Sequence, residues 1–237
     1  MKTSVKIGLG LLGLGVVMMV VGSYIGLVIA PPDRYMGDVQ RIMYVHVPTA
    51  WNALLIFTIA LGSAIGFLIT RRWGCDDWLQ AQLELGVLYT ALLCAQGAIW
   101  GKPTWGAWWS WDPRLTTTAI MLLLFAGILA LRANLRLPSE RASLASVATI
   151  LAWVTVPVVY MSVRWWNSLH QIQSTPKTVD PAMVLPLRTN AFAMLFLALG
   201  LTLLRARTLR LQRQALMAPL APPSGDDTEG GSEGVTP

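Results

Sequence analysis

Six apolar stretches, each long enough to cross a lipid bilayer, dominate this 237-residue chain. A membrane-spanning helix needs about 20 predominantly apolar residues. Only 13% of the residues are charged, whereas about a quarter are charged in a typical soluble domain. The sequence therefore predicts an all-α polytopic membrane protein with six transmembrane helices, at residues 7–30, 47–70, 82–101, 115–133, 143–161 and 189–205.

The domain organisation follows from the ends of these stretches. Lys2 and Lys6 precede the first stretch as in a signal peptide, but its apolar core exceeds the roughly 7–15 residues of such peptides, so we expect a retained helix. Pro157 is expected to kink the fifth helix because proline has no backbone N–H. Residues 1–205 form the predicted membrane domain. Residues 206–237, basic and then rich in Pro, Gly and acidic residues, are expected to be a disordered cytoplasmic tail.

The cations predict the orientation of the chain. Six spans place both termini on one side, which would carry eleven of the 18 Lys and Arg residues, whereas the other side would carry seven. Cytoplasmic loops carry the excess of Lys and Arg, so both termini are expected in the cytoplasm. The net charge of +6 then mainly reflects the Lys and Arg residues that orient the spans in the membrane. Because no basic domain lies outside the spans, this charge does not predict nucleic-acid binding.

A Trp-rich loop at about residues 101–114 separates the third and fourth spans on the outer side. Trp105, Trp108, Trp109 and Trp111 lie within seven residues and lead into Asp112-Pro113-Arg114. Helical spacing of Trp105, Trp108, Trp109 and Asp112 favours a short interfacial helix that ends near Asp112. Interfacial tryptophans often only anchor membrane proteins, but this concentration favours an aromatic platform for a large flat ligand. Eight of the eleven tryptophans are predicted on the outer side: Trp51, Trp100, Trp105, Trp108, Trp109, Trp111, Trp165 and Trp166.

The two histidines of the chain, His46 and His170, are both predicted beside this loop on the outer surface. Either could be an ordinary satisfied polar residue. Together they suit the two axial positions of a six-coordinate haem iron, and indole faces suit a porphyrin. Zinc fits less well, since no cysteine or carboxylate cluster completes a tetrahedral site. The chain also lacks C-x-x-C-H, the usual signal for covalent haem attachment.

Charged residues near the histidines could complete such a site. Haem carries two propionates, and Arg41 and Arg114 are candidate partners, with Arg188 as a third. Contact with lipid headgroups is the alternative for these arginines. Asp112 could accept a hydrogen bond from a histidine ring, pair with Arg114, or simply form the turn before Pro113.

The motifs together resemble a known family. Trp105 to Asp112 resembles the W-G-x-x-W-x-W-D signature of the WWD-domain haem-handling proteins of cytochrome c biogenesis. The surrounding motifs are similar to those of the cytochrome c maturation protein C subfamily (CcmC, haem exporter protein C), over roughly residues 5–205. They are Met43-Tyr44-Val45-His46-Val47-Pro48, Gly101-Lys102-Pro103, Asp112-Pro113-Arg114-Leu115-Thr116 and Asn167-Ser168-Leu169-His170-Gln171.

This resemblance implies a function and partners. Proteins of this kind bind haem b at the periplasmic face of the bacterial inner membrane. The resemblance implies that His46 and His170 are the axial ligands of the haem iron and that the Trp-rich loop is the platform for the ring. They deliver the haem to a periplasmic haem chaperone (CcmE-like). They work with the ATPase and membrane subunits of an ATP-binding cassette transporter (CcmA- and CcmB-like) and a small single-span adaptor (CcmD-like), and are not themselves enzymes.

Two other functions stay open at this point. A b-type electron-carrier anchor usually places its haem-ligating histidines within the spans, often as two pairs. A transporter subunit that moves haem across the bilayer would need polar residues near the bilayer midplane, of which this chain has few.

Overall fold

The computed structural model describes residues 2–171 and 179–217, and almost all of them are helical. Six helical spans are long and apolar enough to cross a membrane, as the sequence predicts. The elements are α1 (Lys2–Tyr24), the π-helix η1 (Ile25–Ile29), the 3-10 helix η2 (Asp38–Ile42), α2 (Met43–Thr70), α3 (Trp73–Trp105), α4 (Pro113–Asn134), α5 (Pro138–Trp153), α6 (Thr155–Trp165) and α7 (Pro181–Met217).

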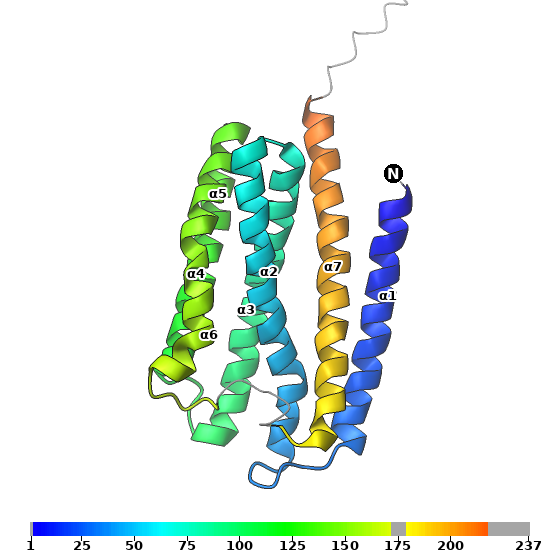
Figure 1. The fold of residues 1–237 in the computed structure, drawn as a ribbon, viewed down its shortest axis with the longest axis vertical. Coiled ribbons are helices and arrows are strands. Elements are labelled where there is room, and N and C mark those ends of the chain that lie inside the picture. The colour runs from blue at the N-terminus through cyan, green and yellow to red at the C-terminus, as the bar shows by residue number, and fades with distance from the viewer. Residues whose placement is uncertain (1, 172–178, 218–237) are drawn as a thin grey trace, which may run out of the picture.

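The helices run side by side along the long axis of the molecule (Figure 1). α2 and α3 lie at the centre, α4 to α6 lie on one side of them, and α7 and α1 lie on the other. The beginning of α1 and the end of α7 lie at the same end of the molecule, here called the terminal end. The opposite end, which holds His46 and His170, is called the histidine end.

Glycines allow α1 to pack closely on α7. A Cβ atom at Gly15 would lie 2.8 Å from Leu197, and one at Gly8 would lie 2.9 Å from Leu204. Gly22 meets Asn190 in the same way, so the contact recurs every seven residues along α1. Small residues let membrane helices approach closely and gain van der Waals contact. This pairing attaches α1 to the rest of the bundle chiefly through α7.

The fifth span is broken into α5 and α6 at Val154. Pro157 cannot donate a hydrogen bond to the carbonyl of Trp153, four residues earlier, and the Thr155 hydroxyl instead donates to the Ala152 carbonyl at 2.7 Å. The predicted interruption by Pro157 is therefore confirmed. The two halves diverge: α5 packs against both α2 and α4, whereas α6 packs mainly against α4.

The last span is longer at both ends than the sequence predicts. α7 begins at Pro181 and contains Pro186, so its start at residue 189 was predicted too late. It also continues to Met217, and the predicted disorder from residue 206 is wrong for residues 206–217. Ion pairs with α3 explain part of this extension, since Arg205 binds Glu84 at 2.6 Å and Arg213 binds Asp77 at 2.7 Å. Residues 218–237 of the predicted tail lie outside the described residues.

Candidate functional site

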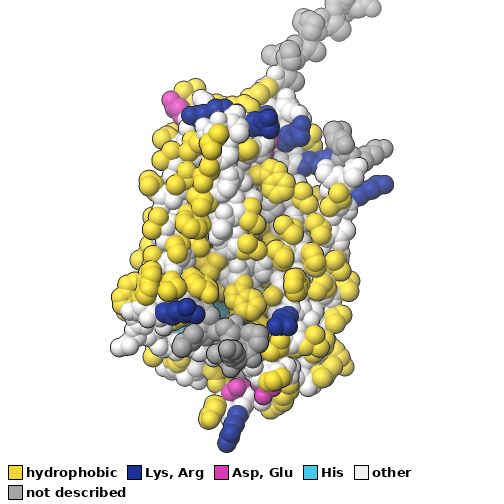
Figure 2. Space-filling model, in the orientation of Figure 1, with side chains coloured by type: hydrophobic (Ala, Val, Ile, Leu, Met, Phe, Trp, Pro, Cys, Tyr) yellow, Lys and Arg dark blue, Asp and Glu magenta, His cyan; other side chains and the backbone are white. Residues whose placement is uncertain are grey.

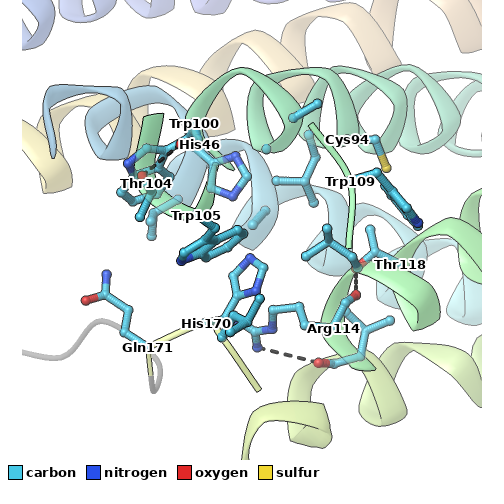
Figure 3. A pocket seen from close by; sticks show the side chains of 18 of the residues that line it. His46, Cys94, Trp100, Thr104, Trp105, Trp109, Arg114, Thr118, His170 and Gln171 are labelled. Atoms are coloured by element: carbon cyan, nitrogen blue, oxygen red, sulfur yellow. Dashed lines mark hydrogen bonds between the residues drawn. The ribbon is translucent and has the colours of Figure 1, made fainter. Parts of the chain in front are cut away.

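A cavity of about 220 Å³ opens at the histidine end, between α2, α3, α4 and α6. Apolar and aromatic side chains form most of its wall. His46 and His170 both line it, as Figure 3 shows, although 124 residues separate them in the chain (170 − 46 = 124). The structure thus brings together the two histidines that the sequence analysis singled out.

His46 is held in the first turn of α2, where Pro48 also lies. Its ring packs edge-on against Trp100 of α3, with ring centroids 5.4 Å apart. Gly97 of α3 leaves the space for this ring, because a Cβ there would lie 3.3 Å from Cε1 of His46. The Nδ1 atom of His46 is buried and has no hydrogen-bond partner among the described residues. An imidazole with such a nitrogen can serve as a metal ligand.

His170 lies in the irregular segment after α6 and is held near Asp112. Oδ2 of Asp112 accepts a hydrogen bond from the Leu169 N–H at 2.6 Å, and Oδ1 accepts one from the Ser168 hydroxyl at 3.1 Å. Nδ1 of His170 lies 3.4 Å from Oδ1 of Asp112. A carboxylate beside one ring nitrogen fixes a histidine's orientation and leaves the other nitrogen for a metal. Asp112 therefore orients the segment that carries His170.

Burial sets the protonation states of this pair. Desolvation lowers the pKa of His170 to about 4, against the opposing attraction of Asp112. Burial alone would raise the pKa of Asp112, but hydrogen bonds from Leu169, Ser168 and the Arg114 N–H bring it below its usual value. At neutral pH the imidazole is then neutral, the form that binds a metal, and the carboxylate is charged.

Residues 106–112 of the Trp-rich loop are not helical, so the predicted interfacial helix through Asp112 is wrong. α3 runs on to Trp105 and ends there because Gly106 adopts a left-handed conformation, with φ of 79°. The Gly106 N–H donates to the Lys102 carbonyl at 3.0 Å, a common glycine termination of helices. Asp112 then caps the start of α4, accepting the Arg114 N–H at 2.8 Å. The loop is thus an irregular link between two capped helix ends.

Only two of the four loop tryptophans reach the cavity. Trp105 and Trp109 line it, and the Trp105 ring lies edge-on to His170 with centroids 4.9 Å apart. Figure 3 shows the Trp105 indole between the two imidazoles. Trp108 and Trp111 are not among the lining residues and are 59% and 82% exposed. Trp111 packs instead edge-on against Trp109, with centroids 5.8 Å apart.

The three candidate arginines are placed differently. Arg114 lines the cavity, and its Nε atom is buried without a hydrogen-bond partner among the described residues. Arg41 is not brought to the cavity: it pairs with Asp38 at 2.7 Å and donates to the carbonyls of Gly26, inside η1, and of Ala30, directly after it. Arg188 is exposed on α7 and is also absent from the cavity wall.

Further lining residues were missed as site residues by the sequence analysis. Trp51 of α2 and Trp100 of α3 were recognised only as outer-side tryptophans, and Tyr160 of α6 and Cys94 of α3 were not connected with the site. Trp51 and Trp100 each lie within five residues of a site motif, which was an available signal. Nothing in the sequence links Tyr160 or Cys94 to a site that requires four helices to converge.

Comparison with known proteins identifies relatives over most of the chain. A family described as "Heme exporter protein C" matches residues 1–219. The protein named "Heme exporter protein C" of Haemophilus influenzae is 38% identical over 207 residues, covering 85% of this chain and 84% of the relative. Its namesake in Escherichia coli K12 is 36% identical over 198 residues, covering 83% and 80%. A ccmC-like mitochondrial protein of Marchantia polymorpha, named for cytochrome c biosynthesis, is 34% identical over 167 residues, covering 69% and 71%.

Proposed function

Because this chain belongs to the haem exporter protein C family of cytochrome c maturation, we propose that it holds haem between His46 and His170 and delivers it to a partner protein. The observation that carries this proposal is the meeting of the two histidines of the chain in one aromatic-lined cavity at one end of a membrane-spanning bundle. Neutral imidazoles on two sides suit the two axial positions of haem iron.

The residues present fit this cargo in several respects. The buried Nδ1 atoms of His46 and His170 both have no hydrogen-bond partner among the described residues, and the Asp112 carboxylate lies 3.4 Å from that of His170. Arg114 offers a buried cation for a propionate, while Trp105 and Trp109 offer aromatic surfaces. Aromatic rings gain by stacking on, or lying edge-on to, another conjugated ring.

The size of the cavity limits how the cargo can sit. A cavity of about 220 Å³ is below the roughly 300–1,000 Å³ typical of sites that bury most of a small ligand. A porphyrin between the histidines therefore needs the Trp105 indole to move aside, and part of the ring projects from the protein. A projecting edge suits a protein that hands its cargo on, because a partner can contact the ring before the histidines release it.

The proposed orientation places the histidine end in the periplasm. It is supported by the Lys and Arg side chains that gather at the terminal end in Figure 2. Arg71 and Arg132 lie at the ends of α2 and α4 on that side, and Arg205 and Arg213 lie in the last part of α7. We propose that the protein resides in the bacterial inner membrane and acts with a periplasmic haem chaperone, an ATP-binding cassette ATPase with its membrane subunit, and a small single-span adaptor. The family name supports membership of a haem export complex.

The absorption spectrum of the purified protein tests the proposal. After expression with ample haem, the protein should carry haem b with the spectrum of a six-coordinate iron. His46→Ala and His170→Ala should each lose that signature and fail to load the chaperone. A matched control is Tyr35→Ala, an aromatic residue of the first loop at the same end that is 90% exposed and is not on the cavity wall, which should keep both properties.

Two results would contradict the proposal. One is a wild-type preparation that contains no haem under these conditions. The other is chaperone loading that persists at its normal level in both histidine variants. Fast reduction of the bound haem by a quinol would instead favour an electron-carrier function.

A further inference from the structure

Among the described residues, α2 and α6 are poorly joined to each other on one side of the cavity. α5 packs along α2, but beyond the break at Val154 the chain turns toward α4, and α6 barely touches α2. This poorly joined side, here called the gap, belongs to the half of the bundle that contains the cavity, since residues of both α2 and α6 line the cavity.

The residues at the two edges of this gap connect the cavity with the outside of the bundle. Trp51 of α2 and Tyr160 of α6 both line the cavity, yet they are 37% and 44% exposed. Figure 2 views the bundle from the side, perpendicular to the helices, and histidine atoms are visible on that face. The cavity is therefore open sideways.

The opening lies at a depth where the surroundings are lipid. On α2 the cavity wall extends from His46 to Leu54, which is about 12 Å along a helix at 1.5 Å per residue. At the deeper level the wall is formed by apolar side chains such as Leu54, Leu93 and Val159. In a bilayer such an opening faces acyl chains, so it admits a molecule that is already dissolved in the membrane.

Specific bonds hold the gap open. On one side, Arg114 of α4 donates to the carbonyls of Val159 and Tyr160 at 3.5 and 3.4 Å, which ties α6 to α4. On the other side, Trp153 at the end of α5 donates from Nε1 to the Thr58 hydroxyl of α2 at 3.4 Å. The fifth span is thus tied to α2 just before the break and to α4 after it.

We propose that the cavity is loaded from the side: haem, a flat amphiphile, passes from the lipid leaflet at the histidine end through the gap between Trp51 and Tyr160. This inference rests on the proposed function, since it assigns a route to the same cargo.

Cross-linking across the gap tests this route. In a background with Cys75→Ser and Cys94→Ser that still binds haem, Trp51→Cys and Tyr160→Cys are combined and joined with a bismaleimide. Haem uptake is then followed by absorbance after mixing with vesicles that carry haem in their bilayer. The joined protein should take up haem about tenfold more slowly or worse, because the added barrier acts on access alone.

The matched control joins the same two spans at the terminal end, through Ile69→Cys and Leu144→Cys, two exposed positions on α2 and α5. Protein joined through this pair should take up haem from vesicles at the same rate as protein that is not joined. Protein that is loaded first and then joined across the gap should keep its six-coordinate spectrum. If the gap pair is not folded, Tyr160→Cys alone, modified with a bulky polar maleimide, should slow uptake from vesicles in the same way.

The outcomes separate this inference from the proposed function. If the protein joined across the gap takes up haem from vesicles as fast as the control pair and shows a normal spectrum, side loading is wrong but the proposed haem binding stands. Absence of any haem spectrum in the unmodified protein overturns both. Slow uptake by the joined gap pair with normal uptake by the control pair supports side loading.

Discussion

At the scale of single residues, Asp112 connects the site with the fold. Its side chain is almost fully buried, and it accepts hydrogen bonds from Leu169, Ser168 and the Arg114 N–H. The same carboxylate therefore caps α4 and holds the segment that presents His170. Of the roles that the sequence left open, the turn before Pro113 is confirmed, whereas Nδ1 of His170 lies 3.4 Å from Asp112 without a hydrogen-bond partner among the described residues.

Replacing this carboxylate should weaken haem retention. In Asp112→Asn one acceptor oxygen becomes an NH₂ group that faces donors, which costs about 1–3 kcal/mol for a buried unsatisfied group. We expect the variant to lose haem faster and to show a weakened six-coordinate spectrum. The control is Asp33→Asn, because Asp33 caps a turn at the same end by accepting the N–H groups of Tyr35 and Met36. Equal haem retention in both variants would contradict the role of Asp112.

Gly97 should matter because of the ring that it faces. In Gly97→Ala the new Cβ would lie 3.3 Å from Cε1 of His46, so the imidazole must shift by a few tenths of an ångström. We expect haem to dissociate several-fold faster, whereas the helix itself gains about 0.5–1 kcal/mol from losing a glycine. Gly62→Ala in α2, which meets open space, provides the control. A dissociation rate that is unchanged in Gly97→Ala would show that the position of His46 tolerates this shift.

At the scale of elements, the end of α3 decides how the tryptophans are presented. Helical spacing had suggested a continuous face from Trp105 to Asp112, but Gly106 turns the chain away directly after Trp105. Trp105 thus belongs to a rigid helix, while Trp108 and Trp111 belong to an irregular loop that leaves them exposed. The contributions of these tryptophans to haem binding should accordingly differ.

An alanine at Gly106 should disturb this end. The left-handed conformation, with φ of 79°, costs a non-glycine residue about 1–2 kcal/mol. We expect Gly106→Ala to shift the loop, so that haem retention and chaperone loading both fall. Gly37→Ala carries at least as large a penalty in the first loop of the histidine end, because φ of 55° with ψ of −136° is a conformation that essentially only glycine adopts, and it should leave both properties closer to normal. If Gly37→Ala lowered haem retention and chaperone loading more than Gly106→Ala does, the end of α3 would not be important for the site.

The sequence was more informative about element types than about their ends. Hydropathy alone identified six spans, because a bilayer requires apolar helices. The extension of α7 was missed because its support comes from Asp77 and Glu84, more than a hundred residues away in the chain. The end of α3 was missed although Gly106 itself was a usable signal. The two histidines and Trp105 were singled out because each of them lies in a short motif. Tyr160 belongs to no motif and reaches the cavity only through the break at Val154.

At the scale of the whole molecule, α1 is a peripheral helix. It contacts α7 over most of its length and has little contact with α2, whereas the cavity is formed by α2, α3, α4 and α6. α7 is joined to the central helices by buried polar contacts, such as Asn190 to the Tyr44 carbonyl at 2.8 Å. The candidate site and the attachment of α1 are therefore expected to be separable.

A bulky residue at Gly15 tests this separation. In Gly15→Leu the side chain would collide with Leu197 and the Ala193 carbonyl of α7, and such overpacking typically costs about 1–3 kcal/mol. We expect a lower thermal stability in detergent and faster proteolysis of α1, with the haem spectrum unchanged. Gly13→Leu, at a position that meets open space, should alter neither property. Loss of the spectrum in Gly15→Leu would show that α1 also supports the site.

The continuity of α3 makes it a lever between the two faces of the membrane. Its 33 residues form a rod of about 50 Å at 1.5 Å per residue, with Asp76 and Asp77 near one end and Trp105 at the other. Pivoting such a rod by about 5° at its centre moves each tip by about 2 Å. A partner that displaces the tip at the terminal end would thus move the indole between the histidines as well, and spin labels at Trp78→Cys and Lys102→Cys, each measured against α4, would detect opposite movements of the two tips.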